Sequence, residues 1–171
     1  IGGLLCTNDP VLAQKEKDLL ILTEGYPTYG GLAGRDLEAM AVGFVEVLNE
    51  DYLKYRLAEV RYLGEHLQHI GFHTIQPPGG HAVYIDARTT LDHIPQKQYP
   101  GHPLAVEFYK SGGVRTCEIG SVMFGRWDPE TKQEIPSSME LLRMALPRRT
   151  HTQSHIYYVL EVAKEVLERK K

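Results

Sequence analysis

The chain has 171 residues, of which 42% are hydrophobic and 24% charged, a composition typical of one globular domain or of a domain with a subdomain. The net charge of -3 and the scattered Lys and Arg residues exclude a nucleic-acid-binding stripe, and no apolar run approaches the roughly 18 residues of a membrane span. Two cysteines make no disulfide framework, and without a visible secretory signal we expect a cytoplasmic protein.

The first 35 residues mix short apolar runs with turns. The pattern predicts a helix over residues 13–18 and a buried strand over residues 19–22. A stretch rich in Gly and Pro follows at residues 24–34, long enough to be a functional loop. It carries Tyr26 and Tyr29, whose rings can stack on a flat ligand or anchor a partner. The residues alone leave both roles open.

Two helices are predicted next. The first covers residues 36–48 with Asp36 as its N-cap, and the second covers residues 50–70 and ends at Gly71. Apolar residues at steps of three and four give the second helix one stripe, formed by Leu53, Leu57, Val60, Leu63, Leu67 and Ile70. We expect a boundary near residues 49–52, which separates residues 1–49 from a smaller domain over residues 50–171.

The second half of the chain alternates strand and helix patterns. Strands are predicted over residues 72–76, 81–86, 114–119 and 141–146, and helices start at residue 103 and cover residues 152–170. This β-β-α-β-β-α order, after the long helix, predicts a two-layer α/β subdomain whose helices pack on one face of a small sheet.

One arginine stands inside an apolar strand. Arg143 lies between Leu142 and Met144, and a guanidinium in such a strand needs an anionic partner because an unpaired buried charge is costly. Arg also grips carboxylates through two parallel hydrogen bonds. Arg143 is therefore a candidate anchor for an acidic small molecule such as an amino acid. A structural salt bridge to an internal Asp or Glu is the alternative.

Other chemistry finds little support in the sequence. The pairs His66 with His69 and His151 with His155 lack further ligands for a metal, so capping or packing is the expected role of these histidines. Ser121 is not in a nucleophile elbow. The glycines at residues 30–34 resemble a phosphate cradle only loosely, and a buried, unreactive role is expected for Cys117.

Four motifs in order resemble one family. They are EGYPTYGGLAGRD at residues 24–36, GGHAVYIDA at 79–87, VRTCEIG at 114–120 and LRMALPRRT at 142–150. They resemble the C-terminal half of the β-eliminating lyases, the family of tryptophanase and tyrosine phenol-lyase, over nearly the whole chain. The resemblance implies a fold-type I enzyme that uses pyridoxal phosphate, a potassium-like cation and a homotetrameric assembly. Residues 1–49 would then be a remnant of the large cofactor-binding domain.

The resemblance also assigns roles to residues. Arg143 matches the arginine that binds the substrate α-carboxylate. Tyr26 and Tyr29 match residues of a loop that reaches the active site of the neighbouring subunit. Ile119 stands where phenol-cleaving members carry Arg and indole-cleaving members an apolar residue. A phenol hydroxyl would stay unpaired beside Ile119, at a cost of about 1–3 kcal/mol. The tryptophanase activity, which splits tryptophan to indole, pyruvate and ammonium, is therefore favoured over tyrosine phenol-lyase activity.

The resemblance leaves the catalytic machinery outside this chain. It places the Schiff-base lysine and the phosphate ligands before Ile1, and an indole-site histidine after Lys171. We therefore expect a fragment without a catalytic residue of its own, inactive unless the missing N-terminal half of the same enzyme is its partner. A non-catalytic small-domain remnant is the second hypothesis. An aminotransferase small domain is the third, and the Tyr-containing loop argues against it.

Overall fold

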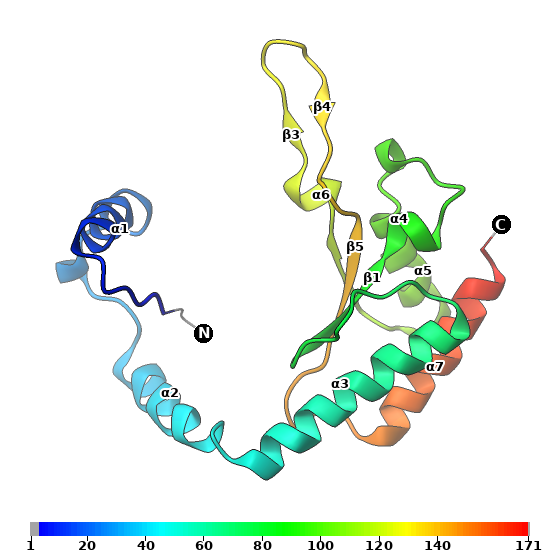
Figure 1. The fold of residues 1–171 in the computed structure, drawn as a ribbon, viewed down its shortest axis with the longest axis horizontal. Coiled ribbons are helices and arrows are strands. Elements are labelled where there is room, and N and C mark those ends of the chain that lie inside the picture. The colour runs from blue at the N-terminus through cyan, green and yellow to red at the C-terminus, as the bar shows by residue number, and fades with distance from the viewer. Residues whose placement is uncertain (1–3, 171) are drawn as a thin grey trace. The chain divides into compact units, whose positions relative to one another are not determined.

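The computed structural model describes residues 4–170 of the chain. The chain divides into two compact units, Ile1–Glu50 and Asp51–Lys171, and each is described by itself (Figure 1). Among the described residues, no helix combines the length and the apolar character needed to cross a bilayer.

The first unit begins with helix α1, over Pro10–Thr23. The side chain of Asp9 accepts hydrogen bonds from the backbone N–H groups of Val11 and Leu12, which caps the helix start. The strand and the burial predicted for residues 19–22 are both wrong. Leucine is a strong helix former that continues a capped helix, and the three leucines of this run are exposed.

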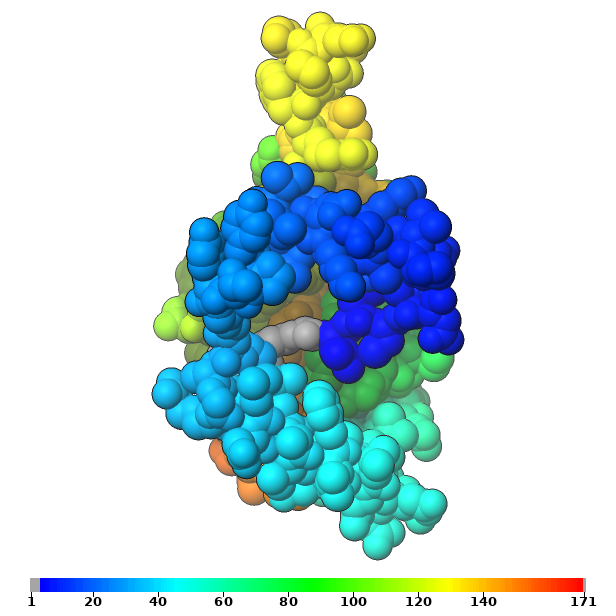
Figure 2. All heavy atoms as spheres, turned by 90° about the vertical axis from the view of Figure 1, so that its left-hand side faces the viewer, coloured from blue at the N-terminus to red at the C-terminus, as the bar shows by residue number. Residues whose placement is uncertain are grey.

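The loop after α1 contains one 3-10 turn, η1, over Pro27–Tyr29, and helix α2 follows over Gly34–Glu46. The N-cap of α2 is Ala33 and not Asp36 as predicted. Asp36 lies in the first turn, where its carboxylate is favourable near the positive end of the helix dipole. Neither α1 nor α2 has a buried residue in the described part of the chain, and Figure 2 displays their side chains on the surface.

The second unit starts on the long helix α3, over Glu50–Ile70, as predicted. The backbone reverses at Gly71, whose φ of 116° favours glycine. The predicted stripe is confirmed for its central part, because Val60, Leu63 and Leu67 are buried. The N-terminal end of the stripe is exposed at Leu53 and Leu57.

A three-stranded antiparallel sheet forms the centre of this unit. Its strands are β1 over Ala82–Asp86, β5 over Leu141–Ala145 and β2 over Cys117–Ile119, in the order β1-β5-β2. The strand predicted over residues 72–76 is wrong, because this segment forms only an isolated bridge between Thr74 and Ile85. The first strand of the predicted β-β-α-β-β-α order is therefore reduced to this single bridge.

Helices cover one face of this sheet, as predicted. Helix α5 spans Gly101–Gly112 and α7 spans Gln153–Glu168, while the short α4 (Ala87–Thr90) and η2 (Gln96–Gln98) follow β1. Alternate strand residues point into the core with side chains of α3, α5 and α7. The core includes Val60, Leu63, Leu67, Phe72, Val83, Ile85, Leu104, Phe108, Leu142, Met144, Ile156, Leu160, Ala163 and Val166.

A hairpin that the sequence did not predict follows β2. Helix α6 spans Ser121–Phe124, and the short strands β3 (Arg126–Trp127) and β4 (Glu134–Ile135) pair antiparallel. The side chain of Asp128 accepts hydrogen bonds from two backbone N–H groups of the connecting turn, a common use of Asp in turns. The hairpin projects from the sheet as a narrow protrusion (Figures 1 and 2).

Candidate active site

The open face of the sheet carries both residues singled out in its strands. Arg143 lies opposite Tyr84 of β1 and Cys117 of β2, and Ile119 lies opposite Leu141. Directly opposed residues of antiparallel strands share a face. The neighbours Leu142 and Met144 are buried under the helices. Arg143 and Ile119 therefore lie together on the face that α3, α5 and α7 leave open.

The spacing of these two residues suits an amino acid. Ile119 is the diagonal neighbour of Arg143, two positions from Cys117 on the adjacent strand. Such diagonal pairs are about 7–8 Å apart between their backbone positions. A carboxylate held by Arg143 would thus place a side chain of aromatic length near Ile119.

The guanidinium of Arg143 has no anionic partner among the described residues. Its Nε is buried and lacks a hydrogen-bond partner, and within residues 4–170 no hydrogen bond or ion pair holds this side chain. The internal salt bridge left open by the sequence is absent from the described residues. A partly buried guanidinium without a counterion is able to accept a carboxylate from a ligand.

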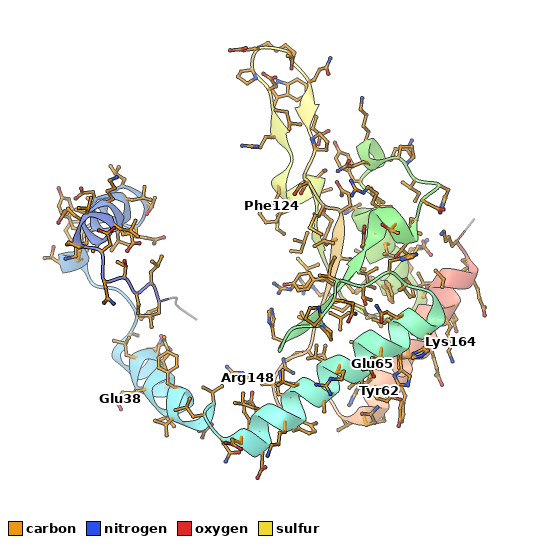
Figure 3. The ribbon with its side chains drawn as sticks, in the orientation of Figure 1. Glu38, Tyr62, Glu65, Phe124, Arg148 and Lys164 are labelled. Carbon is orange, nitrogen blue, oxygen red and sulfur yellow. The ribbon has the colours of Figure 1, made fainter. Side chains whose placement is uncertain are left out.

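A groove of about 680 Å³ adjoins Ile119 at the base of the hairpin, a volume within the range of small-molecule sites. It is lined by Ile119, Phe124, Arg126, Met139 and Leu141, with the connection between β4 and β5. We call it the hairpin-base groove. Phe124, at the foot of the hairpin in Figure 3, supplies an aromatic wall. The sequence did not single out Phe124 or Met139, since the hairpin carries no periodic pattern.

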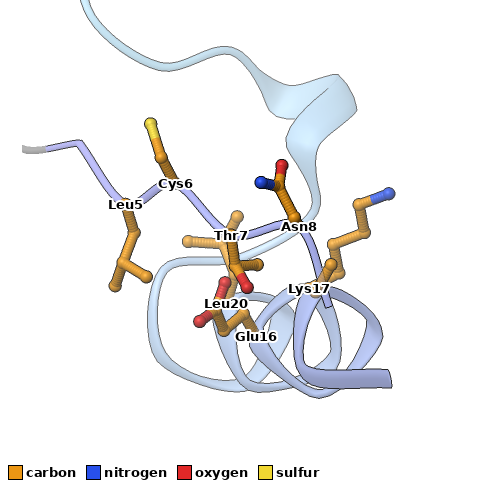
Figure 4. Close-up of a pocket in the computed structure, with 8 residues that line it drawn as sticks. Leu5, Cys6, Thr7, Asn8, Glu16, Lys17 and Leu20 are labelled. Carbon is orange, nitrogen blue, oxygen red and sulfur yellow. The ribbon is translucent and has the colours of Figure 1, made fainter. Parts of the chain in front are cut away.

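A second hollow, of about 690 Å³, lies in the first unit (Figure 4). It lies between residues 5–8 and one side of α1, and its lining includes the exposed Cys6 together with Glu16 and Lys17. Because Glu16 and Lys17 carry opposite charges, this hollow does not favour a ligand of either charge. The sheet face with its unpartnered guanidinium is the better amino-acid site.

The tyrosine loop lies in the first unit. The rings of Tyr26 and Tyr29 meet edge to face with centroids 5.6 Å apart, and both side chains are exposed. Two such rings offer a paired aromatic surface to a flat ligand or to a partner. Their part in an active site stays a prediction.

The histidines have local roles in the structure. Nδ1 of His155 accepts the backbone N–H of Thr152 at the start of α7, which confirms the capping role. His66 and His69 each contact a carbonyl one turn earlier in α3. Among residues 4–170, no group of three or more His, Cys, Asp or Glu is placed to hold a metal ion.

Two carboxylates lie beneath the turn that follows Ile119. Glu140 is fully buried, and Glu118 has one buried oxygen, Oε1, without a hydrogen-bond partner. Burial raises the pKa of the Glu118 carboxyl, the neighbouring charge of Glu140 adds to this, and backbone N–H groups of the α6 turn oppose it. Sequence reasoning missed both residues, because single acids between apolar positions give no recognisable pattern.

The raised pKa of Glu118 predicts how stability depends on pH. Its stabilising contribution is complete below the unfolded pKa near 4.5 and is lost as pH rises through the higher folded pKa. We expect Glu118→Gln to raise the melting temperature more at pH 7 than at pH 4.5. The corresponding difference in the free energy of unfolding should be less than about 1 kcal/mol, because solvent screens the partly exposed group. Thermal melts at both pH values check this. Glu161→Gln, on the exposed face of α7, is the control, and an equal gain at both pH values would contradict the assignment.

The family follows from comparison with known proteins. The β-eliminating lyase family model matches residues 1–162. The chain belongs to the β-eliminating lyase family. It is 56% identical to the tryptophanase of Salinibacter ruber over 99% of the chain and 53% identical to that of Hyphomonas neptunium over 97%. Identity to the tyrosine phenol-lyase of Intrasporangium calvum is 46% over 100% of the chain. The chain spans 36% of the length of each of these three relatives.

The lyase family requires a cofactor whose covalent anchor the sheet face does not supply. No strand residue on the face of Arg143 and Ile119 is a lysine, and the amine of a lysine is what anchors pyridoxal phosphate to a protein. The described residues of this face fit the carboxylate and the side chain of a substrate instead.

Proposed function

We propose that the chain is the substrate-binding part of a lyase that cleaves L-tryptophan to indole, pyruvate and ammonium by β-elimination. The observation that carries the proposal is the guanidinium of Arg143, which has no anionic partner within residues 4–170 and lies on the same sheet face as the apolar Ile119. The higher identity to tryptophanases than to tyrosine phenol-lyases supports the choice of indole. Tyrosine phenol-lyase activity is the alternative, and a non-catalytic remnant is the second alternative.

The residues of this chain bind and orient the substrate in the proposed reaction. Arg143 holds the α-carboxylate by paired hydrogen bonds, which fixes the direction of the Cα–H bond. Ile119 and Phe124 enclose the indole ring and keep water from it. Pyridoxal phosphate, when bound to the complete enzyme, supplies the electron sink that makes the Cα proton acidic.

The wider setting of the chain is also proposed from its family. We propose that the complete enzyme has the fold-type I architecture, needs a monovalent cation such as potassium and works in the cytoplasm. It would be a homotetramer in which Tyr26 and Tyr29 reach the active site of a neighbouring subunit. The exposed aromatic pair at these two positions suits such a contact.

A chimaeric enzyme tests the proposed activity. This chain replaces the matched segment of Salinibacter ruber tryptophanase, a relative 56% identical over 170 residues. We expect the chimaera to bind pyridoxal phosphate, visible by its absorbance, and to release indole from tryptophan. Phenol release from tyrosine in preference to indole would favour the alternative lyase. A chimaera that binds the cofactor and releases neither product would contradict the proposal.

The substitution Ile119→Arg tests the specificity position in the chimaera. A charged guanidinium in the apolar wall is poorly compensated beside an indole ring, while it can hydrogen-bond a phenol hydroxyl. We expect kcat/KM for tryptophan to fall by about 10-fold to 100-fold and the ratio of phenol to indole release to rise. Kinetics on both amino acids check this, with Ile119→Leu as the matched apolar control. An unchanged ratio would remove Ile119 from the aromatic wall.

A further inference from the structure

A buried carboxylate at the foot of the hairpin has an unusual set of partners. Glu140 is 0% exposed, and no cation pairs with it among the described residues. Its oxygens accept hydrogen bonds from the backbone N–H of Ser121 at 3.2 Å, from the Ser121 hydroxyl, and from Nε2 of Gln96 at 3.1 Å. Neutral donors thus replace the water that a buried carboxylate loses.

These donors come from segments that are far apart in the sequence. Ser121 starts α6, directly after β2 and Gly120, while Gln96 lies in η2. The Ser121 hydroxyl also accepts the backbone N–H of Ser137 at 2.9 Å, and Gln96 donates to the Ser137 carbonyl at 2.7 Å. One carboxylate therefore joins the chain entering the hairpin to the chain leaving it.

Both joined segments form walls of the hairpin-base groove. Ile119 and Phe124 flank the Gly120–Ser121 turn on one side. Met139 and Leu141 flank Glu140 on the other, and Leu141 also pairs with Ile119 in the sheet. A change in the partners of Glu140 would therefore move both walls of the groove.

Gly120 makes this arrangement possible because it has no side chain. A Cβ at this position would collide with carboxylate oxygens of both Glu140 and Glu118. Its φ of -149° is outside the left-handed region that favours glycine, so the preference for glycine here comes from the close approach of the carboxylates. The turn after Ile119 is thus built around the buried acid.

We infer that Glu140 is a positioning residue for the aromatic subsite: its buried carboxylate fixes Ile119 and Phe124 at the foot of the hairpin. The inference rests on the proposed function for its enzymatic meaning. Glu140 touches no substrate in this scheme. It acts through the α6 turn, so it governs how well an aromatic side chain is held and leaves the carboxylate anchor Arg143 untouched.

The first test needs no enzymatic activity. Trp127 is the only tryptophan of the chain and lies on β3 of the hairpin, so its fluorescence anisotropy reports the mobility of the hairpin. In the 171-residue chain, we expect the anisotropy to fall in Glu140→Leu and in Ser121→Ala. It should stay near the original value in Glu140→Gln, whose amide oxygen still accepts from Ser121.

The matched control is Glu59→Gln. Glu59 is a buried carboxylate of α3 that accepts the Tyr55 hydroxyl and pairs with Arg56 at 3.7 Å. This substitution removes a buried charge far along the chain from the hairpin. If Glu59→Gln lowers the anisotropy as much as Glu140→Leu, or if no variant of Glu140 or Ser121 changes it, the inference is overturned. Ser121→Ala keeps the test decisive if Glu140→Leu fails to fold.

The second test measures specificity in the chimaera. For Ser121→Ala we expect kcat/KM for tryptophan to fall by about 10-fold. The value for an amino acid with a small thiol leaving group on Cβ should stay within about 2-fold, since that substrate does not need the aromatic wall. The single variant Glu140→Gln should retain most of the tryptophan activity, because its amide oxygen still accepts from Ser121. Equal losses for both substrates would overturn the inference. Failure of the unsubstituted chimaera to release indole would instead contradict the proposed function and leave the anisotropy test standing.

Discussion

Replacing Arg143 by methionine is expected to lower kcat/KM for tryptophan in the chimaera by about 100-fold to 1,000-fold. The substrate carboxylate would lose a charge-assisted partner that offers two parallel hydrogen bonds. Truncating one member of such a pair costs about 2–5 kcal/mol, and each 1.36 kcal/mol is about tenfold in rate. Initial rates of indole release over a range of tryptophan concentrations measure the effect.

Stability separates this role from a structural one. Because the Arg143 guanidinium has no anion among the described residues and its Nε is buried without a partner, its removal breaks no internal bond. We expect Arg143→Met to keep or raise the melting temperature of the chain. Arg143→Lys should retain part of the activity, since it keeps the charge but loses the bidentate geometry. A lower melting temperature with activity intact would make Arg143 a structural residue.

The periodic elements were predictable because their burial is one-sided. The stripe on α3 and the alternation of Val83 and Ile85 in β1 reflect contact with a single core. Helix α7 was predicted within one or two residues at its ends. In α1, by contrast, an apolar run of four residues suits a strand or a helix equally well. The cap at Asp9 settles that ambiguity, and it acts from outside the run.

The candidate site was predictable only in part, for a related reason. Arg143 is conspicuous because its sequence neighbours are apolar. Its position beside Ile119 depends on the pairing of β2 with β5, across more than twenty residues that include the hairpin. The buried role of Glu140 depends on donors from two separate segments, Gln96 of η2 and Ser121 of α6. No local pattern encodes such a convergence, so sequence reasoning could name the anchor and not the residue that shapes the groove.

The largest loss of stability is expected from Phe108→Ala. Phe108 is 0% exposed on the core side of α5, and its ring lies 5.8 Å from that of Phe72, between centroids. Removing the ring takes apolar surface out of the core and leaves a cavity that the surrounding helices fill only partly. Such substitutions cost about 3–5 kcal/mol, a large share of the stability of a small domain.

Urea unfolding followed by far-ultraviolet circular dichroism measures this loss in the 171-residue chain. The control is Tyr109→Ala, the next residue of α5, whose side chain is 63% exposed and should change stability by less than about 0.5 kcal/mol. Because α5 covers the sheet face opposite Arg143, the loss of packing in Phe108→Ala should also destabilise the sheet strands that carry the site. A transition that moves as little for Phe108→Ala as for Tyr109→Ala would mean that α5 does not hold the sheet, and that the open face keeps its geometry by another contact.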